Sequence, residues 1–373
     1  MEKRGKMAPV SQTPNKFGGI MRKILTIALV ALMAASLFAG VTTKGYVQGA
    51  AHFTKEDGSD AVLFAEDSDN KAQVSITDEN KVWGTTLNAQ KQVFKTNTWV
   101  DVMKLAKVDS DFAAKIVVLT GDRLATLTAY KNNADENNYW RLRNDFNFSK
   151  VGGPSGEGTS INAQIGYGKY VSAQAGFQIW QGPITKVNRE DKTSFFTSIL
   201  VTPVDGVKAS AGYGIYDFDS KKDAFVVAGD VDVAKLAGLD FTFGAGIAYR
   251  KYDKVATGAK ISNNQVVEVY TTGNDDGILT AQVYGAYAGV NAYAEMTFLD
   301  AKELKLSAAY QFCDAADAGV YVFFADYDDT DFDENVKLGV EANYKVAKNI
   351  SLYGNIEWAK KNFDAEARCK VTF

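Results

Sequence analysis

The residue types that most often carry out chemistry are sparse in this chain of 373 residues. It holds one histidine, His52, and two cysteines, Cys313 and Cys369. Hydrolases of the Ser-His and Asp-His types need a histidine as acid and base, and a structural zinc site needs a cluster of His and Cys ligands. We therefore predict that the chain is not an enzyme and carries no cofactor. We interpret His52 as an incidental residue of a strand.

One acidic run has part of the spacing of a calcium loop. Asp329, Asp331 and Asp333 stand at positions 1, 3 and 5 of such a loop. The glycine expected at position 6 is Glu334, and the glutamate expected at position 12 is Val340. We interpret the run as a solvated loop that is only a weak candidate for a cation site.

Long alternating segments are the clearest pattern in the chain. Residues 336–346 alternate between apolar and polar side chains without a fault, and 350–358, 304–312, 290–298 and 239–250 repeat the pattern. A period of two indicates a strand with one apolar and one polar face. These segments have about 9–11 residues, which suits a tilted strand that crosses a bilayer, whereas strands of soluble proteins have about 5–6. We therefore predict an all-β fold, a transmembrane antiparallel up-and-down β-barrel.

The polar faces of these strands hold the candidate functional residues. In a membrane barrel the apolar face meets lipid and the polar face turns toward the lumen. Charged residues on those faces would bias the passage of ions. The lumen-lining candidates are Lys337, Glu341, Lys345, Glu357, Lys305, Glu295, Asp240 and Arg250.

Short and long connectors alternate along the C-terminal two thirds, as the short periplasmic turns and longer external loops of such barrels do. We predict about 16 strands, with 14 or 18 as alternatives, a size at which an aqueous channel opens. The N-terminal third is less regular. Residues 123–130 and 138–148 are candidate strands, 99–105 fits a strand or a short helix, and 55–97 fits strands, a plug or a loop.

The N-terminus has the parts of an export signal. Met21-Arg22-Lys23 precedes the apolar run of 24–38 and the small residues Ala39-Gly40, which is the order of a secretory signal peptide; an uncleaved anchor is the alternative. We predict that residues 1–20 are an upstream mis-start or leader, 21–40 the signal peptide and 41–373 a single barrel. Without its first 40 residues the chain loses six basic and one acidic residue, so its net charge becomes −9. This argues against a nucleic-acid partner.

The last segment resembles a known assembly signal. Residues 365–373 alternate and end in Phe373, which resembles the terminal strand of Gram-negative outer-membrane barrels. That resemblance implies recognition by the barrel-assembly machinery. In organisation, 41–373 resembles outer-membrane porins, and the Leu and Phe before the signal cleavage site are similar to those of spirochaete porin-like proteins.

The resemblance implies a location in the cell outer membrane, contact with its lipid, and passive diffusion of small hydrophilic solutes. It is compatible with a homo-oligomer. A transporter of hydrophobic ligands, and a surface-exposed adhesin or structural barrel, are alternative functions.

The two cysteines belong to strands that are far apart in this arrangement. Cys369 shares the lipid-facing side of Val371 and Phe373, and three strands separate its strand from the one that ends at Cys313. Neighbouring strands lie about 4.8 Å apart, while a disulfide needs Cα atoms within about 7 Å. We therefore predict that the two thiols are not bridged.

Overall fold

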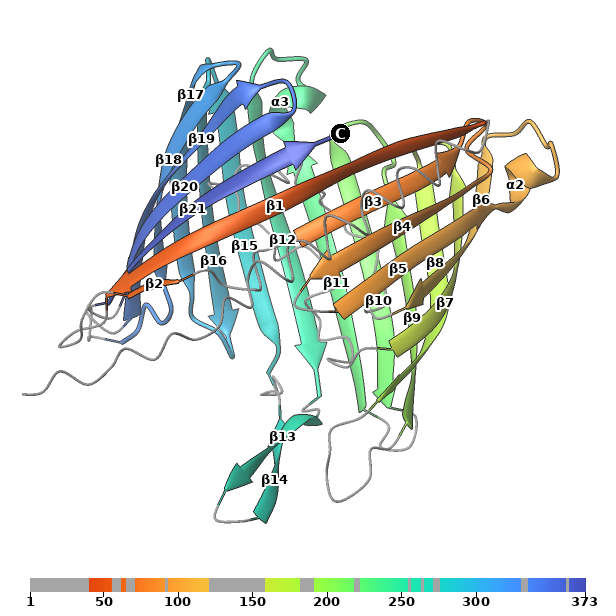
Figure 1. The fold of residues 1–373 in the computed structure, drawn as a ribbon, viewed down its shortest axis with the longest axis horizontal. Coiled ribbons are helices and arrows are strands. Elements are labelled where there is room, and N and C mark those ends of the chain that lie inside the picture. The colour runs from red at the N-terminus through yellow and green to blue at the C-terminus, as the bar shows by residue number, and fades with distance from the viewer. Residues whose placement is uncertain are drawn as a thin grey trace, which may run out of the picture.

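Antiparallel strands form one closed ring in the computed structural model (Figure 1). The sheet has 19 strands, of which the three-residue β2 pairs only with β1, so 18 strands make up the ring. The ring closes where β21 pairs with β1 over residues 46–55 and 363–372. The structure describes residues 40–55, 62–64, 71–90, 93–120, 158–181, 191–217, 222–253, 256–262, 265–270, 276–329, 335–359 and 362–373.

The wall strands are mostly 8–12 residues long, and β1 has 15. In chain order the elements are β1 (Val41–Lys55), β2 (Val62–Phe64), β3 (Lys71–Asp78), β4 (Trp83–Gln90), β5 (Val93–Asp101), α2 (Val102–Leu105), β6 (Phe112–Thr120), β7 (Gly158–Tyr167), β8 (Val171–Gln181), β9 (Asp191–Val201), β10 (Val207–Asp217), β11 (Lys222–Asp232), α3 (Val233–Leu236), β12 (Thr242–Tyr252), β13 (Ala256–Ser262), β14 (Gln265–Tyr270), β15 (Ile278–Tyr287), β16 (Val290–Leu299), β17 (Leu304–Cys313), β18 (Ala316–Phe324), β19 (Val336–Ala347), β20 (Ile350–Ala359) and β21 (Asn362–Thr372).

The predicted all-β barrel is confirmed, but the main count of about 16 strands is wrong and the alternative of 18 is right. Within 55–97, for which strands, a plug or a loop were open, β3, β4 and the start of β5 are wall strands. Their faces are poorly separated by polarity, because Thr85 and Thr98 lie on the outer face while Trp99 lies on the inner one. The two threonine hydroxyls form a hydrogen bond of 2.9 Å with each other, so they can lie in an apolar setting. The candidate strands at 123–130 and 138–148 lie outside the described residues, as does the proposed leader.

Both ends of the described chain lie at the end of the barrel that carries the short connectors. Gly40 accepts a hydrogen bond from Glu79 in the β3–β4 turn, and Phe373 exchanges two backbone hydrogen bonds with Gly45. We call this the turn end and the opposite one the loop end. The separate hairpin of β13 and β14 belongs to the connection between β12 and β15, at the loop end (Figure 1).

Two turn-end connectors fold into matching helical turns, α2 and α3. With its two capping residues, α2 has the sequence Asp-Val-Met-Lys-Leu-Ala, and α3 has the sequence Asp-Val-Ala-Lys-Leu-Ala. In each, the aspartate caps the turn, with Asp101 accepting from the Lys104 amide at 3.1 Å and Asp232 from the Lys235 amide at 3.0 Å. A side-chain acceptor at the N-cap satisfies an amide that the helix leaves unpaired. Both alternatives for 99–105 are therefore partly realised, because the strand ends at Asp101 and the helical turn follows. Among the described residues no helix is long and apolar enough to span a membrane.

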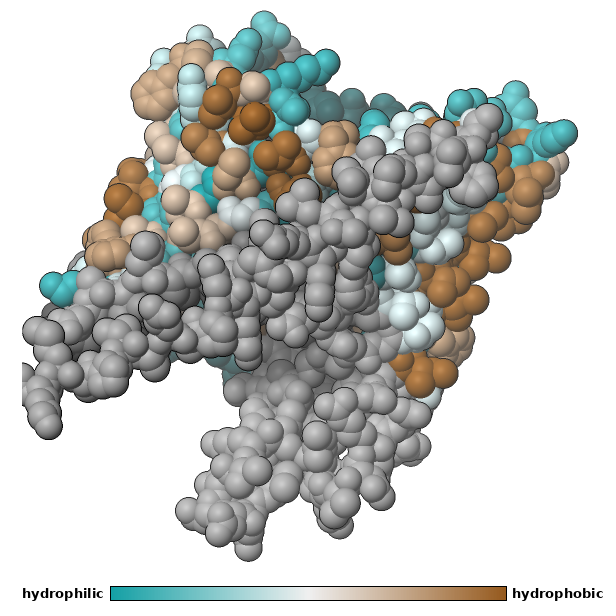
Figure 2. Space-filling view, in the orientation of Figure 1, coloured by the Kyte–Doolittle hydropathy of each residue, from teal (hydrophilic) through white to brown (hydrophobic). Residues whose placement is uncertain are grey.

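The outer face of the barrel is apolar and bounded by aromatic pairs. Figure 2 shows brown, hydrophobic side chains along the right-hand edge of the wall, below hydrophilic ones at the rim. Eight residues separate Phe241 from Tyr249, or about 26 Å along a strand and about 20 Å at a tilt near 40°. This height is close to the apolar band of about 25 Å in outer-membrane barrels. At the turn end the ring pairs are Phe112–Tyr167 (4.8 Å), Phe241–Tyr287 (6.4 Å) and Tyr310–Phe312 (5.1 Å), and toward the loop end they are Phe177–Phe195 (5.0 Å) and Phe225–Tyr249 (5.7 Å).

The prediction for the cysteines is confirmed. Cys313 and Cys369 are exposed and unbridged. They lie on β17 and β21, with β18, β19 and β20 between them.

Candidate functional site in the barrel lumen

Burial alternates along the strands in the reverse of the order seen in a soluble protein. On β7 and β8 the polar Asn162 and Gln178 are 1% and 0% exposed, whereas Ile161 and Phe177 are 55% and 51% exposed. Large apolar side chains therefore point outward and polar ones point into the ring. Residues paired across antiparallel strands share a face, so the strand register carries this assignment around the whole barrel.

The inner wall from β16 to β21, which we call the charged arc, is built from ion pairs. Lys305 on β17 contacts Glu295 on β16 at 2.7 Å and Glu303 at 3.3 Å. The side chains of Lys305 and Glu295 are only 8% and 1% exposed. The hydroxyl of Tyr293 also donates to Glu295. A buried carboxylate needs such partners, because leaving it uncompensated in a low-dielectric setting is strongly unfavourable.

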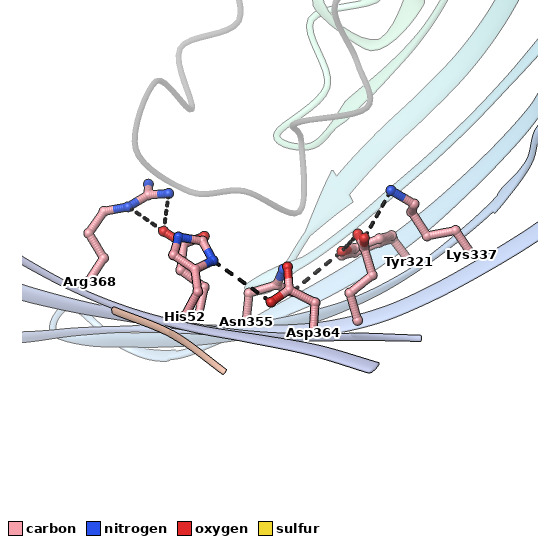
Figure 3. A network of polar contacts seen from close by, with 8 residues as sticks. His52, Tyr321, Lys337, Asn355, Asp364 and Arg368 are labelled. Atoms are coloured by element: carbon pink, nitrogen blue, oxygen red, sulfur yellow. Dashed lines mark hydrogen bonds and ion pairs between the residues drawn. The ribbon is translucent and has the colours of Figure 1, made fainter. Parts of the chain in front are cut away.

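The network continues along β18, β19 and β20 (Figure 3). Lys337 lies 2.9 Å from one oxygen of Glu357, and the Tyr321 hydroxyl donates to the other at 2.7 Å. The Tyr353 hydroxyl donates to Glu341 at 3.1 Å. Tyrosine and lysine donors on neighbouring strands thus hold the lumen carboxylates in fixed positions.

The charged arc ends at the seam between β21 and β1. The Arg368 Nε donates to Glu366 at 2.8 Å, and the guanidinium lies 4.8 Å from the centre of the Tyr353 ring. His52 is 7% exposed and its Nδ1 lies 3.8 Å from Asp364. Figure 3 shows His52, Asp364 and Arg368 along one stretch of the wall. His52 is therefore part of this polar network and more than an incidental strand residue.

The opposite wall contrasts with this arrangement. We define the uncharged arc as the inward-facing residues among 160–166, 172–178 and 194–200, and these positions hold no Asp, Glu, Lys or Arg. Gln174 accepts hydrogen bonds from Asn162 at 3.0 Å and from Gln164 at 3.4 Å. Serines and amides supply the remaining polarity.

Aromatic rings cover glycines on the strands beside them, in both arcs. A Cβ added to Gly339 would lie 2.0 Å from the Tyr321 ring, and one added to Gly214 would lie 2.4 Å from the Phe196 ring. Only glycine leaves room for a ring to lie flat on the neighbouring strand. These glycines therefore orient the lumen aromatics.

Seven of the eight predicted lumen residues face the lumen. Glu295, Glu341, Lys305 and their neighbours lie on the charged arc, and Arg250 lies on β12. Asp240 instead lies in the exposed turn between α3 and β12, outside the wall. On the charged arc the lumen residues are Glu295, Lys305, Lys337, Glu341, Lys345 and Glu357.

Some network members were not singled out from sequence, although alternation in their strands could have indicated them. Glu366 and Arg368 oppose the apolar face of the last strand. Asp230 on β11 accepts from the Tyr284 hydroxyl at 2.7 Å and from Gln282 at 2.9 Å. The pairing partner of each charge depends on strand register, which alternation in a single strand does not reveal.

The weak cation candidate has no support among the described residues. Asp329 is exposed, whereas Asp331 and Asp333 lie outside the described residues. No group of three or more His, Cys, Asp or Glu residues in the described part of the chain could hold a metal ion.

Two charged groups outside the wall have shifted pKa values. A hydrogen bond to Lys235 holds the pKa of Asp205, in the β9–β10 turn, below its ordinary value, and Lys169 adds to this effect. The Asp328 carboxylate raises the pKa of Lys302, in the loop before β17. Both pairs are exposed and join neighbouring connectors.

Comparisons with known proteins give a match in fold only. No family model and no curated protein sequence matches the chain. A mutant of the porin of Rhodopseudomonas blastica is 12% identical and aligns over 89% of this chain and all of its own, with a TM-score of 0.47. Pseudomonas aeruginosa OpdQ is 8% identical, aligns over 90% of this chain and 99% of its own, and has a TM-score of 0.53. With its closed antiparallel ring, apolar exterior and polar interior, the chain has the fold of a porin-like outer-membrane β-barrel.

Proposed function

We propose that this protein is a porin-like channel of the outer membrane, through which small hydrophilic solutes diffuse passively. The observation that carries the proposal is the closed ring of 18 strands with charged side chains inside and apolar ones outside. Barrels of 16–18 strands are wide enough for an aqueous channel. The fixed ion pairs of the charged arc would then set the preference for ions.

The same proposal gives residues 21–40 the role of a cleaved signal peptide and Phe373 the role of an assembly signal. The mature chain would begin near Val41, where β1 starts. Intact mass of the native protein, together with its presence in the outer-membrane fraction of a Gram-negative cell, tests this arrangement. A native chain that retains residues 1–20 would contradict it.

Planar-bilayer recording tests the channel. Discrete conductance steps are expected, and Lys337→Glu or Glu341→Lys is expected to change the cation-to-anion permeability ratio. Asp328→Lys, in the exposed loop after β18, is the control and is expected to have a smaller effect, because solvent screens exposed charges. A barrel that inserts but gives no steps would contradict the proposal.

A transporter of hydrophobic ligands is the second candidate, because part of the inner wall is apolar. Val117, Leu119, Phe196 and Val226 are buried there, with Trp99 packed against them. Acyl chains that copurify with the protein, together with absence of conductance, would favour this candidate.

A further inference from the structure

The helical turns α2 and α3 at the turn end share an apolar pattern as well as a backbone shape. Leu105 in α2 and Leu236 in α3 stand at the same position of the turn, and they are 63% and 49% exposed. A valine lies three residues before each leucine, and a valine or leucine lies three residues after it. All these side chains are exposed, and we call them the α2 patch (Val102, Leu105 and Val108) and the α3 patch (Val233, Leu236 and Leu239).

Both turns end in the same backbone motif, which gives each patch a defined position. In α2 the amide of Lys107, at a φ of 54°, donates to the Lys104 carbonyl at 3.0 Å. The amide of Val108 donates to the Met103 carbonyl, also at 3.0 Å. These are the two hydrogen bonds of a Schellman motif, and the same pair of bonds ends α3. The backbone therefore holds the exposed side chains in place.

The two patches lie beside the surface that meets lipid. α2 leads into Phe112, which pairs with Tyr167 on the outer face, and α3 leads into Phe241, which pairs with Tyr287. Aromatic pairs of this kind mark the edge of the apolar band. Figure 1 shows α2 outside the outline of the wall, beside the turn end of β6. In Figure 2 the same corner carries hydrophilic side chains at its tip and hydrophobic ones below them, continuous with the outer wall.

Exposed apolar side chains that recur at matching positions need a covering surface. Single apolar residues are common on the surface of a protein, whereas clustered ones mark a contact with another protein or with a membrane. Lipid already meets the outer face at the adjacent aromatic pairs, so it can cover both patches without a further partner. The exposed charges of both signs in α2, such as Lys104 and Asp109, suit the hydrated headgroup layer and favour no particular lipid charge.

We propose that α2 and α3 are interfacial anchors, which insert the two patches into the phospholipid leaflet at the turn end of the barrel. Amphipathic segments bind in this way with their apolar side chains about 5–10 Å into the boundary between headgroups and acyl chains. The wall strands β6 to β11 lie between the two anchors, so the barrel is held at two separate points of its rim. The proposal rests on the proposed outer-membrane location and adds to it a device that fixes the depth and tilt of the barrel.

Spin labels on the full chain, reconstituted in phosphatidylcholine vesicles, test the anchors. The background is C313S/C369S, because both native thiols are exposed, and L105C and L236C each introduce one label. The matched control is K348C, in the exposed turn between β19 and β20, and I247C on the outer face of β12 is the lipid reference. EPR compares collisions with oxygen, which concentrates in lipid, and with a water-soluble nickel chelate. The oxygen-to-nickel ratio is expected to be at least about threefold higher at L105C and L236C than at K348C.

Substitutions within the patches test whether their apolar side chains hold the turns in lipid. V102N/V108N in the L105C chain is expected to lower the ratio at the label to that of K348C. V233N/L239N, in the other patch, is the matched control and is expected to leave the ratio at L105C nearly unchanged. I247C combined with V102N/V108N is expected to keep its lipid-like ratio, which shows that the variant barrel remains folded and inserted.

The lipid reference separates failure of the anchors from failure of the membrane location. Ratios at L105C and L236C equal to that of K348C, with a lipid-like ratio at I247C, would overturn the anchors and leave the outer-membrane location standing. The two patches would then be open to a soluble partner. A water-like ratio at I247C would contradict the membrane location itself, and the anchors with it.

Discussion

The charged arc and the uncharged arc face each other across one lumen and solve the burial of polar groups differently. The charged arc buries Glu295 and Glu341 at 2% and 1% exposure and surrounds them with donors from adjacent strands. The uncharged arc buries Gln178 and Ser194 at 0% and uses only neutral polar groups, such as the Asn162 and Gln164 amides that donate to Gln174. The contrast teaches that both sides of one lumen can bury polar side chains while only one side depends on exact pairing of charges.

Because the charged arc depends on exact pairing of charges, the largest loss of stability from a single substitution is expected there. Lys305→Met leaves Glu295 buried without its lysine, and such a loss typically lowers the free energy of unfolding by about 3–5 kcal/mol. In the uncharged arc, Gln174→Leu removes an acceptor from neutral amides and is expected to lower it by about 1–2 kcal/mol. Urea unfolding of the detergent-folded barrel measures both.

The double variant Lys305→Met with Glu295→Gln separates loss of pairing from loss of packing. It is expected to regain most of the stability lost in the single variant, because no buried charge remains. Equal losses for Lys305→Met and Gln174→Leu would show that the two arcs do not differ in this respect.

The next largest loss of unfolding free energy is expected to be similar in both arcs, because it arises from a steric clash. Gly339→Ala and Gly214→Ala would place a Cβ at 2.0 Å and 2.4 Å from the Tyr321 and Phe196 rings. Displacing a ring from a packed site lowers the unfolding free energy by about 1–3 kcal/mol. Thermal or urea unfolding measures it.

Matched glycines in the same regions serve as controls. The nearest atom to a Cβ on Gly354 or Gly229 is a backbone oxygen at 3.9 Å, so alanine at these positions is expected to leave stability nearly unchanged. A large loss of stability in either control variant would show that the backbone, and not the covering ring, makes glycine necessary.

The smallest loss of stability is expected at the turn end beside the uncharged arc, where the charged side chains are exposed. Asp205 lies 3.0 Å from Lys235 and 4.0 Å from Lys169. Its lowered pKa means that its contribution is present above the ordinary value of 3.8 and is lost as pH falls through the folded-state pKa. Asp205→Asn should remove this pH dependence, and added salt should weaken it in wild type. A loss comparable to that of Lys305→Met would contradict the contrast between buried and exposed charges.

The strands that could be predicted from sequence are those whose two faces differ most in polarity. β12, β16, β17, β19 and β20 alternate cleanly, and each lies where the pattern indicated. In β4 and β5 the alternation is blurred by outward Thr85 and Thr98, whose mutual hydrogen bond forms only once the strands pair. A single sequence contains no sign of that pairing, which is why 55–97 could equally be assigned to strands, a plug or a loop.

The candidate site was predictable as a face but not as a network. Alternation indicates that Glu295, Lys305 and Lys337 share the inner side. It does not reveal that Lys305 meets Glu295 while Lys337 meets Glu357, since partners on neighbouring strands depend on register. Asp240 continues the alternating pattern of β12 upstream of Thr242, where the strand begins. The pattern therefore assigned it to the wall, although it lies in the turn before the strand.

The pairing of β21 with β1 has a consequence for how the barrel forms. Ala50 pairs with Arg368, more than 300 residues along the chain, so the two halves of the seam meet only after every other strand has been made. Until then the sheet has two open edges, and unpaired edges recruit other chains. Contacts of such long range also slow folding. We expect a folding intermediate that is prone to aggregate and requires chaperones until the last strand docks.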